Sequence, residues 1–150
     1  MANTFTSLHC HIIFSTKNRE PWITQEHQER LWPYLGGIAR QNQLKPLVIG
    51  GMEDHIHLLL GLPPTASVSD ALKHIKGGSS GWIKENLSGC LGFAWQDGYG
   101  AFTVSKSQMG EVEEYIRNQR EHHRFKTFQE EYRAFLDRHQ IHYEERYLWD

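Results

Sequence analysis

Two short apolar stretches, residues 44–51 (LKPLVIGG) and 54–62 (DHIHLLLGL), follow one another almost without a break. Each is typical of a β-strand, and the intervening GGMED (50–54) suits a tight hairpin turn. Strands joined by so little chain pair antiparallel, because a parallel pair needs a long crossover connection. This hairpin constrains the fold more than any other feature, and it predicts an antiparallel sheet.

The other elements can be placed around this hairpin. Residues 5–15 predict a strand in which Leu8, Cys10, Ile12 and Phe14 alternate onto one face. Thr24 is a suitable N-cap for a helix over 25–43, with a kink expected at Pro33. A second helix, capped by Ser67 or Ser69, follows the hairpin. Three glycines are expected to weaken its middle: Gly77, Gly78 and Gly81.

The last third of the chain predicts a strand within 95–105, then a helix over 106–125 capped by Ser105 or Ser107, and then an amphipathic helix with an aromatic end segment. The resulting order, β-α-β-β-α-β followed by helices, is that of the ferredoxin-like fold. We therefore predict an α+β protein with one domain over residues 1–150, an antiparallel sheet and additional C-terminal helices. That fold serves many functions, so function must be argued from a site.

Composition excludes few classes of function. The net charge of −2 counts mildly against a protein that coats duplex DNA. No apolar run approaches the roughly 20 residues of a membrane span, and the N-terminal segment lacks a signal-peptide pattern. Cys10 and Cys90 have no metal-site spacing. We expect two free thiols, a cytoplasmic protein and no membrane partner.

His55 and His57 are the first candidates for a chemical role. Side chains two apart in a strand share a face, with roughly 7 Å between the Cα atoms at ~3.3 Å rise per residue. Two such imidazoles can bind one cation, or they can be a hydrogen-bonded pair in the core. His9 and His11 repeat the spacing. The pattern alone is therefore weak, and we expect the second pair not to bind metal.

Tyr115 and Gln119 are four residues apart on the predicted helix over 106–125, so they share one side of it, and His122 extends that side. His123 falls in the apolar stripe, where a packing role is expected. A tyrosine hydroxyl attacks phosphate poorly unless a divalent cation polarises the phosphate. Two histidines and a glutamine oxygen suit Mg²⁺ or Mn²⁺ as such a cation.

Basic residues offer a weaker indication of nucleic-acid binding. Lys73, Lys76 and Lys84 lie near tryptophans that could stack on bases, although a solvated helix face explains them equally well. Lys17 and Arg19 are similar candidates in the STKNR loop. KGGSSG (76–81) lacks the spacing of a phosphate-binding loop, so we expect no nucleotide cofactor.

Taken together, these motifs resemble the single-tyrosine HUH transposases of the insertion sequence 200/605 group. The resemblance rests on FSTKNREPWI, GGMEDHIHLLLGLPP, SVSDALKHIKGGSSGWI, FAWQDGYGAFTVSKSQ, YIRNQREHH and YLWD, which span nearly the whole chain. It implies that His55, His57 and Gln119 bind Mg²⁺ or Mn²⁺ and that Tyr115 attacks single-stranded DNA. The products would be a 5′-phosphotyrosine linkage and a free 3′-hydroxyl.

The resemblance also implies a homodimer that recognises DNA hairpins. The apolar residues of the tail favour a dimer too, if one small sheet leaves them uncovered: Phe128, Phe135, Leu136, Leu148 and Trp149. The alternatives are a domesticated relative acting on repetitive hairpins and a non-catalytic nucleic-acid-binding module of the same fold. A histidine-triad nucleotide hydrolase is disfavoured, because Leu59 stands where a third histidine would be.

Overall fold

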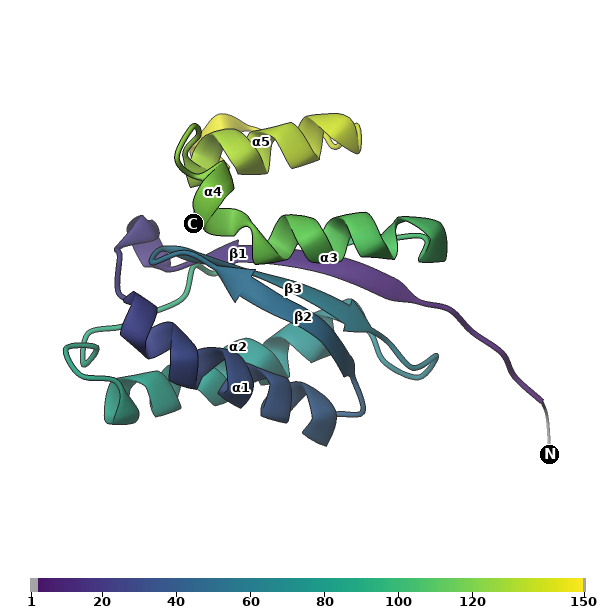
Figure 1. The fold of residues 1–150 in the computed structure, drawn as a ribbon, viewed down its shortest axis with the longest axis horizontal. Coiled ribbons are helices and arrows are strands. Elements are labelled where there is room, and N and C mark those ends of the chain that lie inside the picture. The colour runs from purple at the N-terminus through teal and green to yellow at the C-terminus, as the bar shows by residue number, and fades with distance from the viewer. Residues whose placement is uncertain (1–2, 150) are drawn as a thin grey trace.

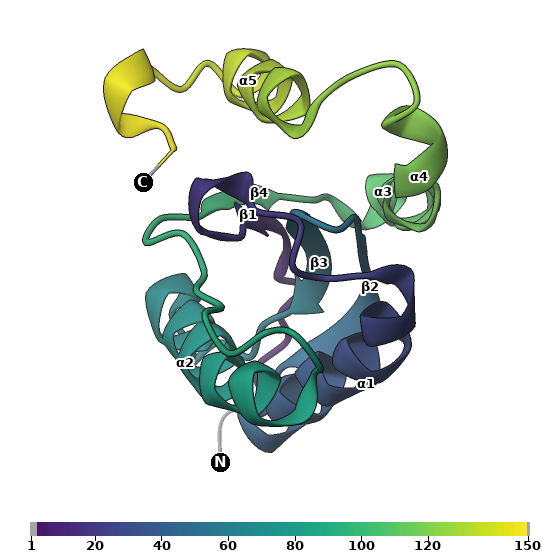
Figure 2. The ribbon, with the colours of Figure 1, turned by 90° about the vertical axis from the view of Figure 1, so that its left-hand side faces the viewer.

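A computed structural model describes residues 3–149 of the chain. Its centre is a four-stranded antiparallel sheet in the order β2-β3-β1-β4 (Figures 1 and 2). The strands are β1 (His9–Ser15), β2 (Lys45–Gly51), β3 (His55–Gly61) and β4 (Gly100–Thr103). The predicted hairpin is β2–β3, which places β3 in the interior of the sheet. The predicted α+β, ferredoxin-like order is confirmed.

Helices cover both faces of the sheet, as Figure 1 shows. On one face lie α1 (Gln25–Gln41) and α2 (Val68–Asn86). On the other face lie α3 (Met109–Arg117), α4 (Gln119–His122) and α5 (Phe128–Arg138). Short 3-10 turns span Lys17–Arg19, Lys106–Gln108 and Glu145–Tyr147. Within residues 3–149, no helix combines the length and the apolar character that crossing a membrane requires.

The period of two along β1 and β3 sorts side chains between these two layers. Cys10, Ile12 and Phe14 of β1 join the core beneath α1 and α2, as the alternation predicts, whereas Leu8 is 46% exposed. From β3, Ile56, Leu58 and Leu60 enter the same core. His55, His57 and Leu59 therefore face α3–α5.

Two glycines permit close packing of a helix. A Cβ on Gly50 of β2 would lie 2.6 Å from the Ile116 carbonyl oxygen, so glycine lets α3 lie directly on the sheet. A Cβ on Gly78 would lie 3.2 Å from Ile38 of α1. Gly77 and Gly81, by contrast, have open space beside them, and α2 is continuous through all three glycines.

The predicted helix over 106–125 is interrupted, and this expectation was wrong. Asn118 has φ −100° and ψ 25°, which separates α3 from α4. Asparagine tolerates such a break because it competes well for non-helical conformations. The predicted serine cap was also wrong: Ser105 and Ser107 bond to each other at 3.1 Å, and α3 begins after a 3-10 turn. Thr24 and Ser67, by contrast, do cap α1 and α2.

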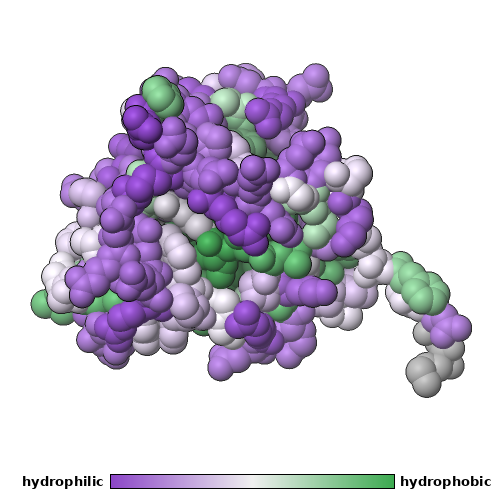
Figure 3. Space-filling model, viewed as in Figure 1, coloured by the Kyte–Doolittle hydropathy of each residue, from purple (hydrophilic) through white to green (hydrophobic). Residues whose placement is uncertain are grey.

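The sheet edge at β2 remains partly open. Leu47, Val48 and Ile49 are only partly buried, although they pack against the core clusters. Figure 3 shows hydrophobic side chains gathered between the two helical layers on this side of an otherwise mostly hydrophilic surface. Elsewhere the thiols of Cys10 and Cys90 are free and buried, as expected.

Lys76 of α2 connects that helix to the loop before β4. Its ammonium group donates to the carbonyl oxygens of Gln96, Asp97 and Gly98 at 2.6, 3.1 and 3.0 Å. An ammonium group has three donors, so this loop takes all of them. Lys76 therefore holds the loop and has no donor left for a DNA phosphate in this conformation.

Replacing Lys76 by methionine should lower the free energy of unfolding by about 2 kcal/mol, because the loop loses its charge-assisted hydrogen bonds. Urea denaturation measures this loss. Lys73→Met on the exposed side of the same helix is the matched control and should change stability by less than about 0.5 kcal/mol. Equal effects of the two substitutions would contradict the structural role given to Lys76.

Candidate active site

The histidine pair of β3 is completely buried. His55 and His57 each have 0% exposure, and their ring centroids are 5.2 Å apart. They share one face of the strand, as the spacing predicts. Burial removes water as a partner, so the ring nitrogens must find their partners within the protein.

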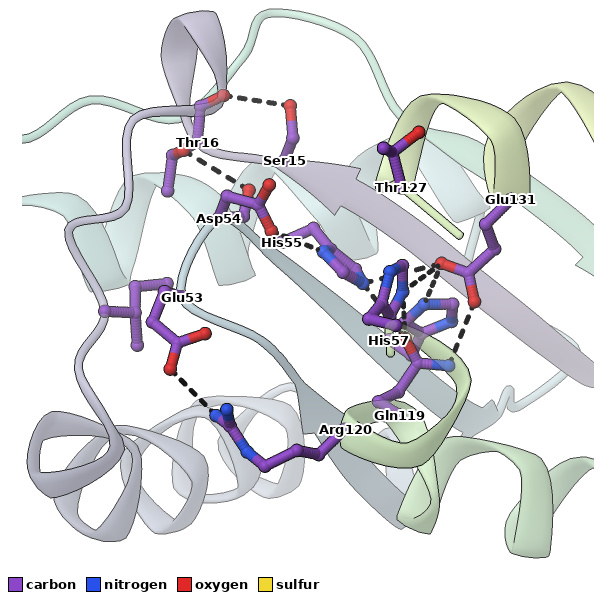
Figure 4. Close-up of polar contacts among 12 residues, drawn as sticks. Ser15, Thr16, Glu53, Asp54, His55, His57, Gln119, Arg120, Thr127 and Glu131 are labelled. Atoms are coloured by element: carbon purple, nitrogen blue, oxygen red, sulfur yellow. Dashed lines mark hydrogen bonds and ion pairs between the residues drawn. The ribbon is translucent and has the colours of Figure 1, made fainter. Parts of the chain in front are cut away.

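A carboxylate from α5 meets both rings. Glu131 has 0% exposure, and its Oε1 lies 3.1 Å from His57 Nε2 and 3.4 Å from His55 Nε2. The same oxygen lies 3.1 Å from Nε2 of His123. Figure 4 shows Glu131 reaching toward the rings from the helical layer. His123 thus has polar contacts in addition to the packing role that was expected of it.

Tyr115 and Gln119 reach the same carboxylate. The Tyr115 hydroxyl donates a hydrogen bond to Glu131 Oε2, and Gln119 Nε2 donates to that oxygen at 3.1 Å. Gln119 Oε1 lies 2.9 Å from His55 Nε2. The tyrosine, the glutamine and the histidine pair, which were singled out from separate segments of the sequence, therefore meet in one cluster.

Further side chains orient the two rings from behind. Asp54 Oδ1 lies 2.7 Å from His55 Nδ1, and His11 Nε2 lies 2.7 Å from His57 Nδ1. Both Nδ1 atoms are engaged, so both Nε2 atoms point into the cluster. Such outer contacts commonly fix the tautomer and direction of metal-binding histidines. His11, which was expected not to bind metal, contacts the imidazole of His57 and can orient it.

Burial and charge shift the pKa values in this cluster. Burial lowers the pKa of His57 to about 4, against the raising effect of Glu131. Burial alone would raise the pKa of Glu131, but the imidazoles of His57, His123 and His55 outweigh it and hold that pKa well below its usual range. Burial and the Glu131 charge raise the pKa of Tyr115. At neutral pH the cluster therefore combines the neutral imidazole of His57 with the carboxylate of Glu131 and the phenol of Tyr115.

This set of donors fits a divalent cation. One ligand atom from each of His55, His57 and Glu131 lies within 4.8 Å of the others. Neutral imidazole nitrogens and carboxylate oxygen are common ligands for Mn²⁺ and related ions. Gln119 Oε1 adds an oxygen beside His55. Glu131 was not identified from the sequence, where it is one of several acidic residues on an amphipathic helix.

Half-buried Tyr115 lies beside a cavity of about 290 Å³. His11, Gln108, Phe135 and Arg138 are among its lining residues. On the side of the exposed Arg138, Tyr115 is therefore accessible from solvent through this cavity. A substrate could approach Tyr115 from there without passing through the sheet.

The predicted DNA-binding residues lie apart from this cluster. Lys73 and Lys84 are exposed on α2, which covers the opposite face of the sheet. Arg19 lies against the Trp149 ring, with its guanidinium carbon 5.4 Å from the ring centroid, while Lys17 is exposed. The structure does not bring these side chains to Tyr115, and their contact with DNA stays a prediction.

Comparison with known proteins gives consistent matches. The family model described as "Transposase IS200 like" matches residues 4–119. The chain is 31% identical over 127 residues to the transposases for insertion sequence element IS200 of Salmonella typhimurium and Salmonella typhi. These alignments cover 81% of this chain and 82% of each relative.

Two solved structures share the fold. A crystal structure from Deinococcus radiodurans R1, assigned as a transposase, is 30% identical with a TM-score of 0.66, and the match covers 79% of this chain and 95% of that one. A tyrosine transposase associated with REP sequences, solved bound to a REP hairpin, has a TM-score of 0.61. It is 13% identical over 82% of this chain and 73% of that one, so it supports the fold alone.

The outer contact of His11 predicts an effect on metal affinity. His11→Ala should weaken Mn²⁺ binding by about 10–100-fold, because His57 loses the partner that orients its ring. The affinity is measured by titrating the protein with Mn²⁺ and following the unbound ion by electron paramagnetic resonance. His9→Ala, the same change two residues earlier on β1, should leave the affinity unchanged. Equal losses in both variants would contradict the assigned role of His11.

Proposed function

Because this chain belongs to the family of IS200-like transposases, we propose that it cleaves and rejoins single-stranded DNA with Tyr115 as the nucleophile. The observation that carries the proposal is the meeting of the Tyr115 hydroxyl with the buried histidine pair around one carboxylate. These groups lie far apart in the sequence, and burying such polar groups together is costly unless they are paired.

In the proposed reaction, the Tyr115 oxygen attacks the phosphorus of a DNA phosphodiester. An O–P bond to the tyrosine forms, and the bond from phosphorus to the 3′ oxygen breaks. The tyrosine loses its proton, and the leaving oxygen ends as a free 3′-hydroxyl. Attack by a 3′-hydroxyl on the phosphotyrosine reverses these changes and joins strands. The bond energy is retained in the intermediate, so no nucleotide cofactor is required.

We assign the metal site to His55, His57 and Gln119, which lie next to the Glu131 carboxylate. A Mg²⁺ or Mn²⁺ ion held there would polarise the phosphate and offset the charge that develops on its oxygens. Asp54 and His11 hold the two imidazoles in the direction this requires. The raised pKa of Tyr115 is consistent with a nucleophile that remains protonated in the resting protein.

The DNA partner proposed here is a single strand marked by hairpins. The family resemblance points to DNA hairpins as the class of ligand, and a protein that shares the fold was solved with a REP hairpin. The cavity beside Tyr115 and Arg138 provides an approach for the strand. Action on chromosomal DNA would place the protein in the cytoplasm.

Tyr115→Phe tests the nucleophile most directly. Covalent adduct formation with labelled single-stranded DNA from the gene's own flanks should disappear, while hairpin binding persists. Stability should fall by about 1.5–3 kcal/mol, because the lost hydroxyl donates to a buried carboxylate. Denaturing gels and mass spectrometry detect the adduct. Tyr99→Phe should still form it, and DNA attached to Tyr99, Tyr132 or Tyr143 would refute the assignment.

We also propose a homodimer. The apolar residues of the tail do not favour it, because Phe128, Phe135 and Leu136 are buried within the chain, and Leu148 and Trp149 pack against the same cluster. The family resemblance and the partly open apolar edge at β2 support the dimer, since an edge strand offers unpaired backbone groups to a second copy.

Light scattering at micromolar concentration, with and without hairpin DNA, should give twice the mass of the chain. Val48→Lys on the β2 edge should shift the mass toward the monomer, because a charge there disfavours edge pairing. Lys45→Glu is a control near the start of the same strand. It adds no charge to the apolar middle of β2, so it should leave the mass unchanged. A monomeric mass in both conditions would exclude the dimer.

A further inference from the structure

The carboxylate at the centre of the cluster comes from outside the region that defines the family match. That match ends at residue 119, so it includes His55, His57, Tyr115 and Gln119 but not Glu131 of α5. The C-terminal helix therefore contributes a functional group whose role the comparisons leave open.

The two oxygens of Glu131 face different partners. Oε1 faces the imidazole nitrogens of His55, His57 and His123 at 3.1–3.4 Å. Oε2 accepts hydrogen bonds from the Tyr115 hydroxyl and from Gln119 Nε2. One rigid carboxylate group therefore joins the nucleophile to the proposed metal ligands.

The position of Glu131 is set by aromatic contacts on either side of it along α5. Phe128 stacks on His55 with ring centroids 4.5 Å apart, and Phe135 meets His11 edge-on at 5.1 Å. Residues 128, 131 and 135 lie on one face of a helix because they are three and four positions apart. The buried face that docks α5 therefore carries the carboxylate between two aromatic anchors.

The C-terminal segment adds a further contact to this docking. The guanidinium carbons of Arg19 and Arg133 lie 5.4 and 5.2 Å from the centroid of the Trp149 ring. Arg19 belongs to the loop after β1 and Arg133 to α5, so Trp149 links the helix to the sheet layer. Cation–π contacts of this kind are favourable.

We propose that Glu131 is a positioning residue, which holds the Tyr115 hydroxyl in a fixed direction beside the cation site. The inference rests on the proposed function of Tyr115. Without this hydrogen bond, rotation of the Tyr115 side chain would move its hydroxyl oxygen away from the position needed for attack. A displacement of about 1 Å in a reacting group can lower the rate by about 100-fold. An acid in the middle of a buried helix face is costly unless paired, and its partners here are the site residues.

The contact can be observed without any reaction. The protein is labelled with 3-fluorotyrosine, and the Tyr115 signal is assigned by its absence from Tyr115→Phe in fluorine NMR. Glu131→Gln keeps the size of the side chain and removes its charge, so it should shift the Tyr115 signal in the metal-free protein. Glu130→Gln is the matched control, because it makes the same change at the exposed neighbouring residue. Glutamine can replace Glu130 in the helix capping box, so the start of α5 should be preserved. Glu130→Gln should leave the chemical shift of the Tyr115 signal unchanged.

The same variants are then assayed in single turnover with saturating Mn²⁺ and saturating single-stranded DNA, so that weaker metal binding does not limit the rate. Glu131→Gln should slow adduct formation by about 100-fold with unchanged DNA affinity, and Glu130→Gln should match the wild type. If Glu131→Gln does not fold, Glu131→Asp, which keeps the charge but shortens the reach, is judged by the same two readouts.

An unmoved Tyr115 signal, or a moved signal with an unchanged rate of adduct formation, would overturn the proposal. So would equal effects of Glu131→Gln and Glu130→Gln. Failure of the proposed function has a different signature: Tyr115→Phe would then still form the adduct, whatever the fluorine signal does.

Discussion

β3 is buried along its whole length and on both of its faces, and the rest of the structure depends on this constraint. A strand that is buried on both faces needs a covering layer on each side of the sheet, and here both layers are helical. Its aliphatic face is covered by α1 and α2, which form the larger core. Its other face carries His55 and His57, so the second layer must satisfy polar groups as well as cover them.

The second layer meets this requirement by bringing its own polar side chains inward. Glu131, Gln119 and Tyr115 are held among the histidines by mutual hydrogen bonds. Within residues 3–149, the buried side-chain nitrogens without a partner are His9 Nδ1 and Arg19 Nη1, and neither lies in the cluster. A fully connected polar network is stable in a low dielectric, whereas the loss of one member leaves the others costly.

The backbone provides the close approach that this network needs. Gly50 allows α3 to lie against β2, which brings Tyr115 over the sheet. The break at Asn118 separates the helix bearing Tyr115 from the short helix that begins with Gln119. Both side chains still reach Glu131 Oε2, so their spacing in the sequence was a sound guide although the continuous helix was not.

Local patterns determined much about this protein without a structure. The hairpin, the alternation of Cys10, Ile12 and Phe14 along β1, and the caps at Thr24 and Ser67 depend on residues close together in the chain, and all are confirmed. The shared face of His55 and His57 follows from the period of a strand. The family resemblance is likewise confirmed, while the assignment of the whole chain to one transposase domain stays a prediction.

Only the tertiary structure decided which side chains complete the site. His11 and His57 are 46 positions apart, and Glu131 is 74 positions from His57. The spacing of Phe128, Glu131 and Phe135 along α5 places Glu131 on the apolar face of the helix, but it does not reveal which side chains this carboxylate meets. Docking of α5 through Phe128 and Phe135 buries Glu131 and leaves the neighbouring Glu130 in water. A carboxylate acquires its partners, and hence its chemistry, from that burial rather than from its neighbours in the sequence.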